Sequence, residues 1–401
     1  MKTKAFIFLC SISVIPCDLP NEIKEEEDTE IFLNKRCDPP CIFSEYYLTL
    51  ETVDGFPKNC TTVCSDLRID KKCDLTENQL AATFKNMKNL IGSLLIEETK
   101  YKSGTFLTGL ETVECGSSDR VQKDINGFDK SFEKIPQFEW DINYEMLELG
   151  LTNLTRISCG FNKITTNVNL TRLNIPNLKS ISYPSGNGKK MYVILDGVGY
   201  NFCITSGELL SFIKTSELQI DMSKVKYCEP PSTVETGKIC NSTSITDGCT
   251  QIFGSLVIGP ENEHLVHQLN TVEVIFGGLV VNNTNLTNID FLESLKYIYH
   301  LDDKSAVIQI ENNPNLSNFS FPSLVVAQTL ANTKILFSNN NEIRTSDSTY
   351  CDRLKNMLNI TDPRQIFFDG KYCDNLLAKS GKSLAFQLWI FGIMITIYYV
   401  Y

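Results

Sequence analysis

Histidine is the residue type whose spacing comes nearest to a metal site in this chain. His264 and His267 are separated by two residues, and the only other histidine is His300. A zinc site takes three or four protein ligands, and no third ligand accompanies this pair. The usual signatures of hydrolases, metalloproteases and phosphate-binding loops do not occur. We therefore expect an exposed histidine pair, and we predict no catalytic, metal-binding or cofactor-binding residue.

Cysteine offers the other chemistry, because 15 cysteines stand beside very few histidines. This balance indicates disulfides rather than zinc, and hence an oxidising compartment. Position and spacing favour the pairs Cys203–Cys228, Cys351–Cys373, Cys240–Cys249 and Cys64–Cys73. Cys115 and Cys159 each follow a strand-like segment and are candidates to bridge adjacent repeats. Cys37, Cys41 and Cys60 are left over, with Cys17 as a candidate fourth member.

Glycosylation sequons and the start of the chain point to the same compartment. Residues 1–17 have the basic start and apolar run of a signal peptide, and residues 18–59 form an acidic, cysteine-containing arm. N-x-S/T sequons begin at Asn59, Asn153, Asn169, Asn241, Asn282, Asn285, Asn315, Asn318 and Asn359. Sequons at this density behind a signal peptide predict an extracellular glycoprotein.

The last residues, 374–401, contain an apolar segment at 384–401 without any charge. Spanning a bilayer takes roughly 20 apolar residues, so two interpretations stay open. One is a GPI signal with its attachment site among Ser380, Gly381 and Ser383, and the other is a retained transmembrane helix. Both predict attachment to the cell membrane. The net charge of −11 argues against nucleic acid as a partner, because phosphate contacts need clusters of Lys and Arg.

A repeat indicates the elements that carry these residues. IFGSLVI at 252–258 returns as IFGGLVV at 275–281, and further apolar trios follow at intervals of roughly 23 to 29 residues. This period predicts stacked turns that each donate one short strand to a parallel sheet. The outer residues of each trio then face the core and the middle residue faces out. The spacing of Ile308, Ile310 and Asn313 predicts that Asn313 bonds the backbone at a corner of the stack.

The same order of segments occurs earlier in the chain. CTTVCSDLRI from Cys60 matches CTQIFGSLVI from Cys249, GSLLIEET from Gly92 matches GGLVVNNT from Gly277, and the segment from Asn167 matches that from Asn313. We therefore predict tandem domains at 60–228 and 229–373. The stretch 114–159 is longer than its counterpart and holds either an insertion or a degenerate repeat.

This order of motifs resembles the receptor L domain, the ligand-binding unit of the insulin and epidermal growth factor receptors. The resemblance covers about Cys60 to Cys373 and is closest in the second domain. It implies a mainly β fold of two right-handed β-helices related to leucine-rich repeats. Only the short stretch from Cys228 to Cys249 replaces the cysteine-rich module of the receptors, and no kinase follows, as in truncated two-L-domain proteins.

The resemblance implies a non-catalytic binding glycoprotein, a decoy or co-receptor for insulin-like or growth-factor-like peptides or for another receptor. A structural or adhesive surface glycoprotein without a peptide ligand is the alternative. The outward row of middle residues is the candidate partner-binding surface, because a contiguous exposed apolar patch usually marks an interface. Its members are Leu95 in the first domain and Val257, Val280, Gln309 and Leu336 in the second. A permanent cover by the first domain, a loop or a twofold mate is the other interpretation of this row.

Overall fold

The computed structural model describes residues 36–116, 137–183, 192–213, 217–220, 225–228, 239–301, 305–317, 320–341, 348–358, 360–373 and 375. The expected signal at 1–17, most of the C-terminal segment 374–401, Asn318 and Asn359 lie outside these residues. Among the helices of the described residues, none has the length and apolar character that a membrane span needs. The contacts divide the chain into two compact units: unit 1 comprises 1–169, 173–195 and 211–219, and unit 2 comprises 170–172, 196–210 and 220–401.

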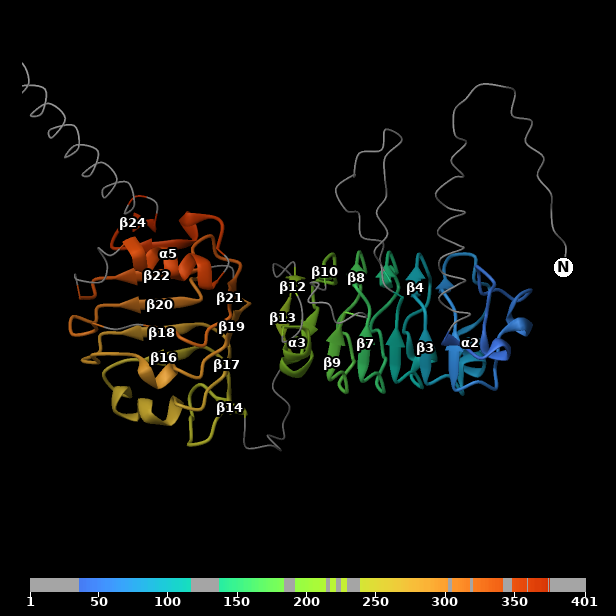
Figure 1. Cartoon of the computed structure of the whole chain (residues 1–401), viewed down its shortest axis with the longest axis horizontal. Helices are drawn as coiled ribbons and strands as arrows, with labels where there is room; N and C mark the ends of the chain where they lie inside the picture. Colours follow the sequence, from blue (N-terminus) through green and yellow to red (C-terminus); the bar gives the residue numbers. More distant parts are fainter. Residues whose placement is uncertain are drawn as a thin grey trace, which may run out of the picture. The chain divides into compact units, whose positions relative to one another are not determined.

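Unit 1 consists mainly of two sheets whose strands alternate along the chain (Figure 1). One sheet has the order β1-β3-β5-β7-β9 and the other β12-β10-β8-β6-β4-β2. All pairings among β1 to β10 are parallel. We use the word coil for two consecutive strands, one in each sheet, together with the segment that leads from them to the next two strands. The strands are β1 (Thr62–Cys64), β2 (Leu67–Ile69), β3 (Asn89–Ile91), β4 (Leu94–Glu97), β5 (Thr112–Glu114), β6 (Phe138–Asp141), β7 (Arg156–Ser158), β8 (Phe161–Thr165), β9 (Ser180–Ser182), β10 (Tyr192–Leu195) and β12 (Glu217–Ile220).

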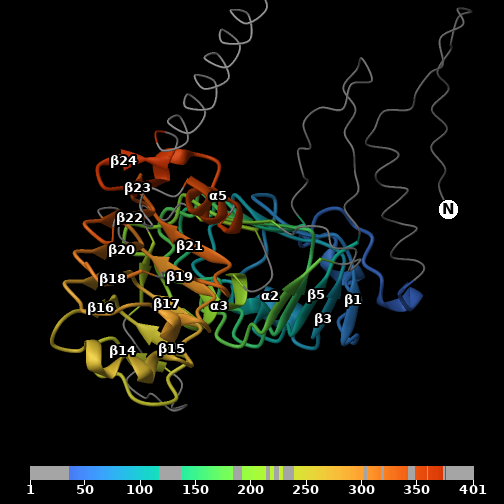
Figure 2. The same ribbon diagram turned by 60° about the vertical axis from the view of Figure 1, so that its left-hand side comes forward.

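Unit 2 repeats this construction with the sheets β14-β15-β17-β19-β21 and β16-β18-β20-β22-β23-β24. Figure 2 shows β16, β18, β20 and β22 stacked as one wall and β17, β19 and β21 as the other. Pairing is parallel except between β23 and β24. The strands are β14 (Ile239–Asn241), β15 (Gln251–Phe253), β16 (Leu256–Ile258), β17 (Val274–Phe276), β18 (Leu279–Asn282), β19 (Tyr297–His300), β20 (Ile308–Glu311), β21 (Val326–Thr329), β22 (Ile335–Ser338), β23 (Ile366–Phe368) and β24 (Lys371–Tyr372).

Short helices and one further strand pair complete the fold. β11 (Cys203–Ile204) and β13 (Lys226–Tyr227) pair in parallel within unit 2. A capping box formed by Thr76 and Gln79 starts helix α2, which satisfies backbone N–H groups that the first helical turn leaves open. The helices are η1 (Pro39–Cys41), η2 (Val53–Gly55), α2 (Glu77–Phe84), η3 (Thr105–Leu107), α3 (Ser206–Ile213), η5 (Glu263–Leu269), η6 (Asp290–Leu292), α5 (Ser348–Met357) and η7 (Pro363–Gln365).

The alternation expected within each apolar trio is confirmed. In β16, Leu256 and Ile258 are buried while Val257 between them is exposed. The outer residues of the following trios, such as Leu279 and Val281, are fully buried in one continuous apolar core. A strand of this length buries too little apolar surface to be stable alone, so the stacking of coils makes the core.

Two disulfides attach the segment before β1 to unit 1. Cys37 bonds Cys64, and Cys41 bonds Cys60. The expected pair Cys64–Cys73 is therefore wrong, because Cys64 at the end of β1 faces the preceding segment rather than the turn after β2. Cys73 is a free cysteine, and the Tyr101 hydroxyl lies 3.3 Å from its sulfur. The described part of the expected arm, from residue 36, packs on the core through Phe43, Leu48 and Phe56.

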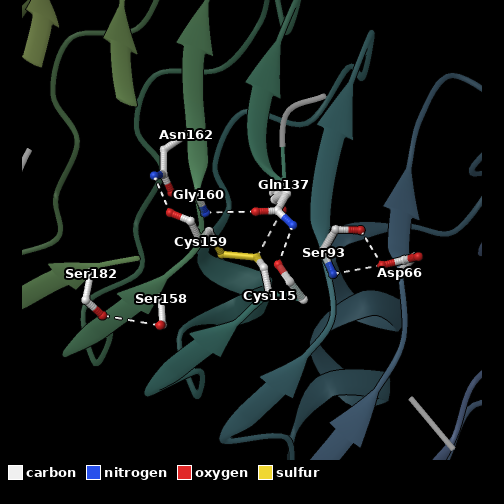
Figure 3. The surroundings of a disulfide bond; sticks show 10 residues. Asp66, Ser93, Cys115, Gln137, Ser158, Cys159, Gly160, Asn162 and Ser182 are labelled. Atoms are coloured by element: carbon white, nitrogen blue, oxygen red, sulfur yellow. Dashed lines mark hydrogen bonds between the residues drawn. A yellow bond between two sulfur atoms is a disulfide. The ribbon is translucent and has the colours of Figure 1, made fainter. Parts of the chain in front are cut away.

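The other disulfides close corners and ends of the stacks. Cys203–Cys228, Cys240–Cys249 and Cys351–Cys373 are present as their spacing suggested. Cys115–Cys159 joins the residues that follow β5 and β7, so it bridges adjacent coils of unit 1 (Figure 3).

Gln137, just before β6, lies beside this disulfide (Figure 3). Gln137 donates from Nε2 to the Gly116 carbonyl at 2.8 Å, and its Oε1 accepts from the Gly160 N–H at 2.8 Å. Residues 116 and 137, the two ends of the extra segment, are thereby fixed to each other and to the next coil. β6 pairs in register with both β4 and β8. Of the two interpretations of the stretch 114–159, the structure therefore supports an insertion in a regular coil and not a degenerate repeat.

Candidate partner-binding face

A glycine corner sets the register of the outward row in unit 2. The chain turns from β15 into β16 through Gly254, whose φ of 98° is disfavoured for other residues. In the next coil Gly277 stacks on it, and a Cβ there would lie 2.5 Å from the Gly254 carbonyl carbon. The Ser255 hydroxyl accepts a hydrogen bond from the Gly278 N–H at 3.0 Å. This close backbone approach aligns the start of β16 with the start of β18.

A ladder of buried asparagines holds the other end of the same strands. Asn313 is fully buried, and its Nδ2 donates to the Val281 carbonyl at 3.0 Å. Asn340 follows in the next coil and donates to the Ile310 carbonyl at 2.6 Å. The corner role expected of Asn313 is thus confirmed. Asn312 also takes part, since it has a left-handed φ of 57° and donates to the Asn282 side chain at 3.0 Å.

Between these two corners the middle residues of the trios form a row. Val257 pairs with Val280, Val280 with Gln309, and Gln309 with Leu336. Phe367 of β23 extends the row by pairing with Leu336, a member that the sequence did not indicate. Val257 is 54% exposed and the other members are half-buried. We call Val257, Val280, Gln309, Leu336 and Phe367 the unit 2 row.

The row borders a hollow. A depression of about 500 Å³ is lined by Ser305, Ala306, Gln309, Ala331, Asn332, Thr333, Leu336, Phe367 and Tyr372. Gln309 donates from its Nε2 back to the Ala306 carbonyl at 3.0 Å, so part of its polar end is already satisfied. Tyr372 packs edge-on against Phe367, with 5.3 Å between ring centroids. The hollow therefore has a mixed lining, with Ala306, Ala331, Leu336, Phe367 and Tyr372 beside the polar Ser305, Asn332 and Thr333.

The second sheet of unit 2 is partly covered within the unit. Phe276 and Tyr299 are buried on it. Tyr227, from β13 of the same unit, packs on Phe276 with centroids 5.8 Å apart. Its hydroxyl donates to the Tyr299 carbonyl at 2.6 Å, and burial raises the Tyr227 pKa well above its usual value. Phe276 and Tyr299 are thus covered, whereas Phe253 and Tyr297 of the same sheet are half-buried.

The corresponding row of unit 1 is charged and paired within itself. Arg68, Leu95, Glu139 and Lys163 pair in register along β2, β4, β6 and β8. Lys163 Nζ lies 2.8 Å from Glu139 and 2.6 Å from Asp141. Burial lowers the Lys163 pKa, but the hydrogen bonds to Asp141 and Glu139 outweigh it, so the pKa is raised. Leu95 is the apolar member of this charged row.

The predicted histidine pair lies on a different element. His264 and His267 are both exposed on η5. Among the described residues, no group of three or more His, Cys, Asp or Glu side chains is placed to hold a metal ion.

Most described sequons lie in the return segments of the coils. Asn153 stands between β6 and β7, Asn169 between β8 and β9, Asn285 between β18 and β19, and Asn315 between β20 and β21, and all four are exposed. Asn59 precedes β1, and Asn241 ends β14, the edge strand of the β14–β21 sheet. Asn282 differs, because it is the last residue of β18, lies on the same face of the sheet as Val280 and is half-buried.

Residues 248–356 match the family model for the receptor L domain. Unit 2 contains a receptor L domain. The matched segment begins just before β15 and ends within α5, so the L domain includes the row from Val257 to Leu336. A search of curated proteins found no match to the chain. The receptor L domain is a ligand-binding, non-catalytic domain, and together with the six disulfides of the described residues it indicates an extracellular protein.

Proposed function

We propose that the protein is a cell-surface binding glycoprotein that uses the unit 2 row to hold a partner polypeptide. An insulin-like or growth-factor-like peptide, or another receptor, is the partner class we favour, with the protein acting as decoy or co-receptor. The observation that carries this proposal is the alignment of Val257, Val280 and Leu336 in register on the β16–β24 sheet, where Val257 is exposed and the other two are half-buried. Contiguous apolar surface of this kind usually marks an interface.

The distribution of sequons supports the same face. Glycans on the return segments would leave the strands of the β16–β24 sheet bare except where Asn282 ends β18. Asn282 is the described sequon that borders the row, and its Oδ1 already accepts from Asn312. A partner that docks along the row therefore meets apolar side chains and the hollow beside Leu336, with polar asparagine amides at one edge.

We further propose that unit 1 is a second L domain and that each unit is a right-handed β-helix. The support is the shared construction: alternate strands enter two sheets, glycine or serine forms the tight corner, and a buried asparagine ladder forms the other corner. In unit 1 the ladder consists of Thr99, Asn143 and Asn167. The domain limits 60–228 and 229–373 remain a prediction.

Attachment to the membrane through residues 374–401 is part of the proposal. A GPI anchor near Ser380 to Ser383 should be released from intact cells by a phosphatidylinositol-specific phospholipase. Retention of the protein, with residues 384–401 still detectable by mass spectrometry, would instead establish the transmembrane helix.

The binding test compares charge substitutions on two equally exposed valines. Val257 and Val325 are each 54% exposed, but only Val257 belongs to the unit 2 row. The purified ectodomain is titrated with a panel of insulin-like and growth-factor-like peptides and with receptor ectodomains. Val257→Asp should weaken binding at least about tenfold, since a buried unpaired carboxylate opposes association, and Val257→Asp with Val280→Asp should abolish it. Val325→Asp should bind like the native protein.

The outcomes separate the competing functions. Equal binding by Val257→Asp and Val325→Asp would remove the row from recognition. If no member of the panel binds and beads coated with the ectodomain cluster, the adhesive alternative holds instead. Loss of secretion by Val257→Asp alone would mean that the row is covered in the native protein.

A further inference from the structure

An apolar cluster is exposed on the return segments of unit 1, away from its strands. Tyr144 is 54% exposed, Leu147 48% and Val168 49%. Tyr144 and Val168 each come directly after a buried ladder asparagine, Asn143 and Asn167. The Asn143 N–H donates to the Asn167 side chain at 3.0 Å, so the two coils are in contact at this level. Tyr144 and Val168 therefore occupy equivalent positions on adjacent coils. We call Tyr144, Leu147 and Val168 the Tyr144 cluster.

A glycosylation sequon is bonded to the backbone of Tyr144. Asn169 is exposed, and its Nδ2 donates to the Tyr144 carbonyl oxygen at 2.6 Å. The nitrogen that would carry a glycan is thus held against the backbone of Tyr144. The middle residue of the sequon, Leu170, is fully buried, which fixes the orientation of Asn169 outward. A glycosylated amide keeps one N–H, so this hydrogen bond is compatible with the modification.

We propose that Asn169 carries an N-linked glycan whose first sugar lies on the Tyr144 ring and covers the Tyr144 cluster. The C–H groups on the face of a pyranose ring carry partial positive charge, and the face of an aromatic ring carries negative charge. Stacking of the two removes apolar surface of Tyr144 and Val168 from water. An exposed apolar cluster in a secreted glycoprotein is then covered by the chain's own modification. The proposal does not depend on the function of the unit 2 row.

Unit 2 offers a matched sequon without the cluster. Asn315 has the same place relative to Asn313 as Asn169 has to Asn167, and it is also exposed. Its middle residue, Leu316, is fully buried as well. The residue before it is Pro314, and the preceding coil presents Asn285 at this level rather than an aromatic side chain. A glycan on Asn315 consequently has no aromatic ring to lie on.

The direct test observes the sugar itself. The ectodomain is secreted from eukaryotic cells fed with ¹³C-labelled glucosamine, and glycopeptide mass spectrometry determines occupancy at Asn169 and Asn315. Ring currents of Tyr144 should move resonances of the first N-acetylglucosamine on Asn169 upfield. Tyr144→Ser should return them to the positions of the Asn315 sugar. An unoccupied Asn169, or resonances that Tyr144→Ser leaves unchanged, would overturn the proposal.

A second measurement uses loss of the glycan. Asn169→Gln removes the amide attachment, and Thr171→Val removes the sequon while keeping Asn169 and its bond to Tyr144. Both should increase the binding of an apolar dye and lower the thermal midpoint by about 2–4 °C, the shift expected for one aromatic contact in a domain of this size. Asn315→Gln should change neither, and in a Tyr144→Ser background the effect of Thr171→Val should disappear. Equal effects of the Asn169 and Asn315 variants would contradict a specific cover of Tyr144.

Discussion

The side-chain oxygen of Asn340 accepts hydrogen bonds from both the backbone N–H and the Nδ2 of Asn313, at 3.2 and 3.0 Å. Asn313 in turn accepts from the backbone N–H and the hydroxyl of Thr284, at 2.9 and 2.7 Å. Each side chain therefore satisfies the backbone of the coil below it. The alignment of the outward row depends on this chain of bonds, because it fixes where each strand of the β16–β24 sheet ends.

Removing the central member of this ladder should be costly. Asn313→Leu removes the buried acceptor of the Thr284 N–H and hydroxyl and a donor to the Val281 carbonyl, and a buried group left without a partner costs about 1–3 kcal/mol. We expect a loss of at least about 3 kcal/mol in the free energy of unfolding of unit 2, measured by urea denaturation. Asn332→Ala, at an exposed turn, is the control and should change it by less than about 0.5 kcal/mol. A small effect of Asn313→Leu would mean that water replaces the ladder.

Two residues next to the ladders have a left-handed backbone conformation, and exchanging isoleucine and asparagine at these positions should change the stability of the two units in opposite directions. Ile142 in unit 1 has a φ of 56°, and Asn312 has the equivalent conformation, with a φ of 57°. Asparagine tolerates this region, whereas a β-branched side chain in it is strained by roughly 1–2 kcal/mol. Ile142→Asn should therefore stabilise unit 1 by about 1 kcal/mol, and Asn312→Ile should destabilise unit 2 by at least as much. Thermal unfolding of both variants measures this, and a destabilising Ile142→Asn would show that side-chain packing outweighs the backbone strain.

Gly92 should tolerate no side chain. A Cβ at this position would lie 2.0 Å from the Ser65 carbonyl oxygen, and its φ of 127° is open only to glycine in practice. Gly92→Ala should destabilise unit 1 by about 3 kcal/mol or more, from overpacking and backbone strain together, and reduce secretion. Gly207→Ala, in α3 with no atom within 4 Å of the new Cβ, is the matched control and should be secreted normally. Normal secretion of both variants would contradict the tight corner.

Cys73 should be identifiable as a poorly reactive free thiol. Burial raises its pKa above the usual value, although the hydrogen bond from Tyr101 opposes the shift. Since the thiolate is the reactive form, alkylation by iodoacetamide near neutral pH should be slower in the native protein than after denaturation. The native rate should still rise with pH beyond the point at which an ordinary cysteine levels off. Peptide mapping that finds Cys73 in a disulfide, or labelled equally fast in both states, would refute the assignment.

The sequence was most informative where one coil repeats the next. The recurring glycine and apolar trio predict that Val257 and Val280 lie side by side, because a fixed period and an alternation of two determine the register. Unit 1 was harder to interpret. Its ladder residue Asn143 follows Trp140 and Ile142, where unit 2 has Ile310 and Asn312 before Asn313. The sequence match therefore aligns Asn313 with Asn167, which lies in the coil after that of Asn143. By its bonds to Thr99, Asn143 is the counterpart of Asn313.

Pairings that depend on three-dimensional proximity were the least predictable. Equal spacing suggested that Cys64–Cys73 would copy Cys240–Cys249, but spacing does not report which segment passes beside β1. The bridge between Ile42 and Cys64 places the preceding segment there, and Cys37 becomes the partner. Likewise, Phe367 joins the unit 2 row only because β23 pairs with β22 across α5 and η7, a connection without the repeat signature.

The hydrogen bonds of Gln137 have a consequence for engineering. Because this one side chain holds Gly116 and Gly160, and Cys115–Cys159 closes the same corner, the stack does not depend on how much chain joins residues 116 and 137. Lengthening a loop whose ends are already fixed costs little, since each doubling adds only about 0.6 kcal/mol. The corner is accordingly a natural graft point, where an epitope or a fluorescent reporter could be inserted while the neighbouring strands keep their pairing.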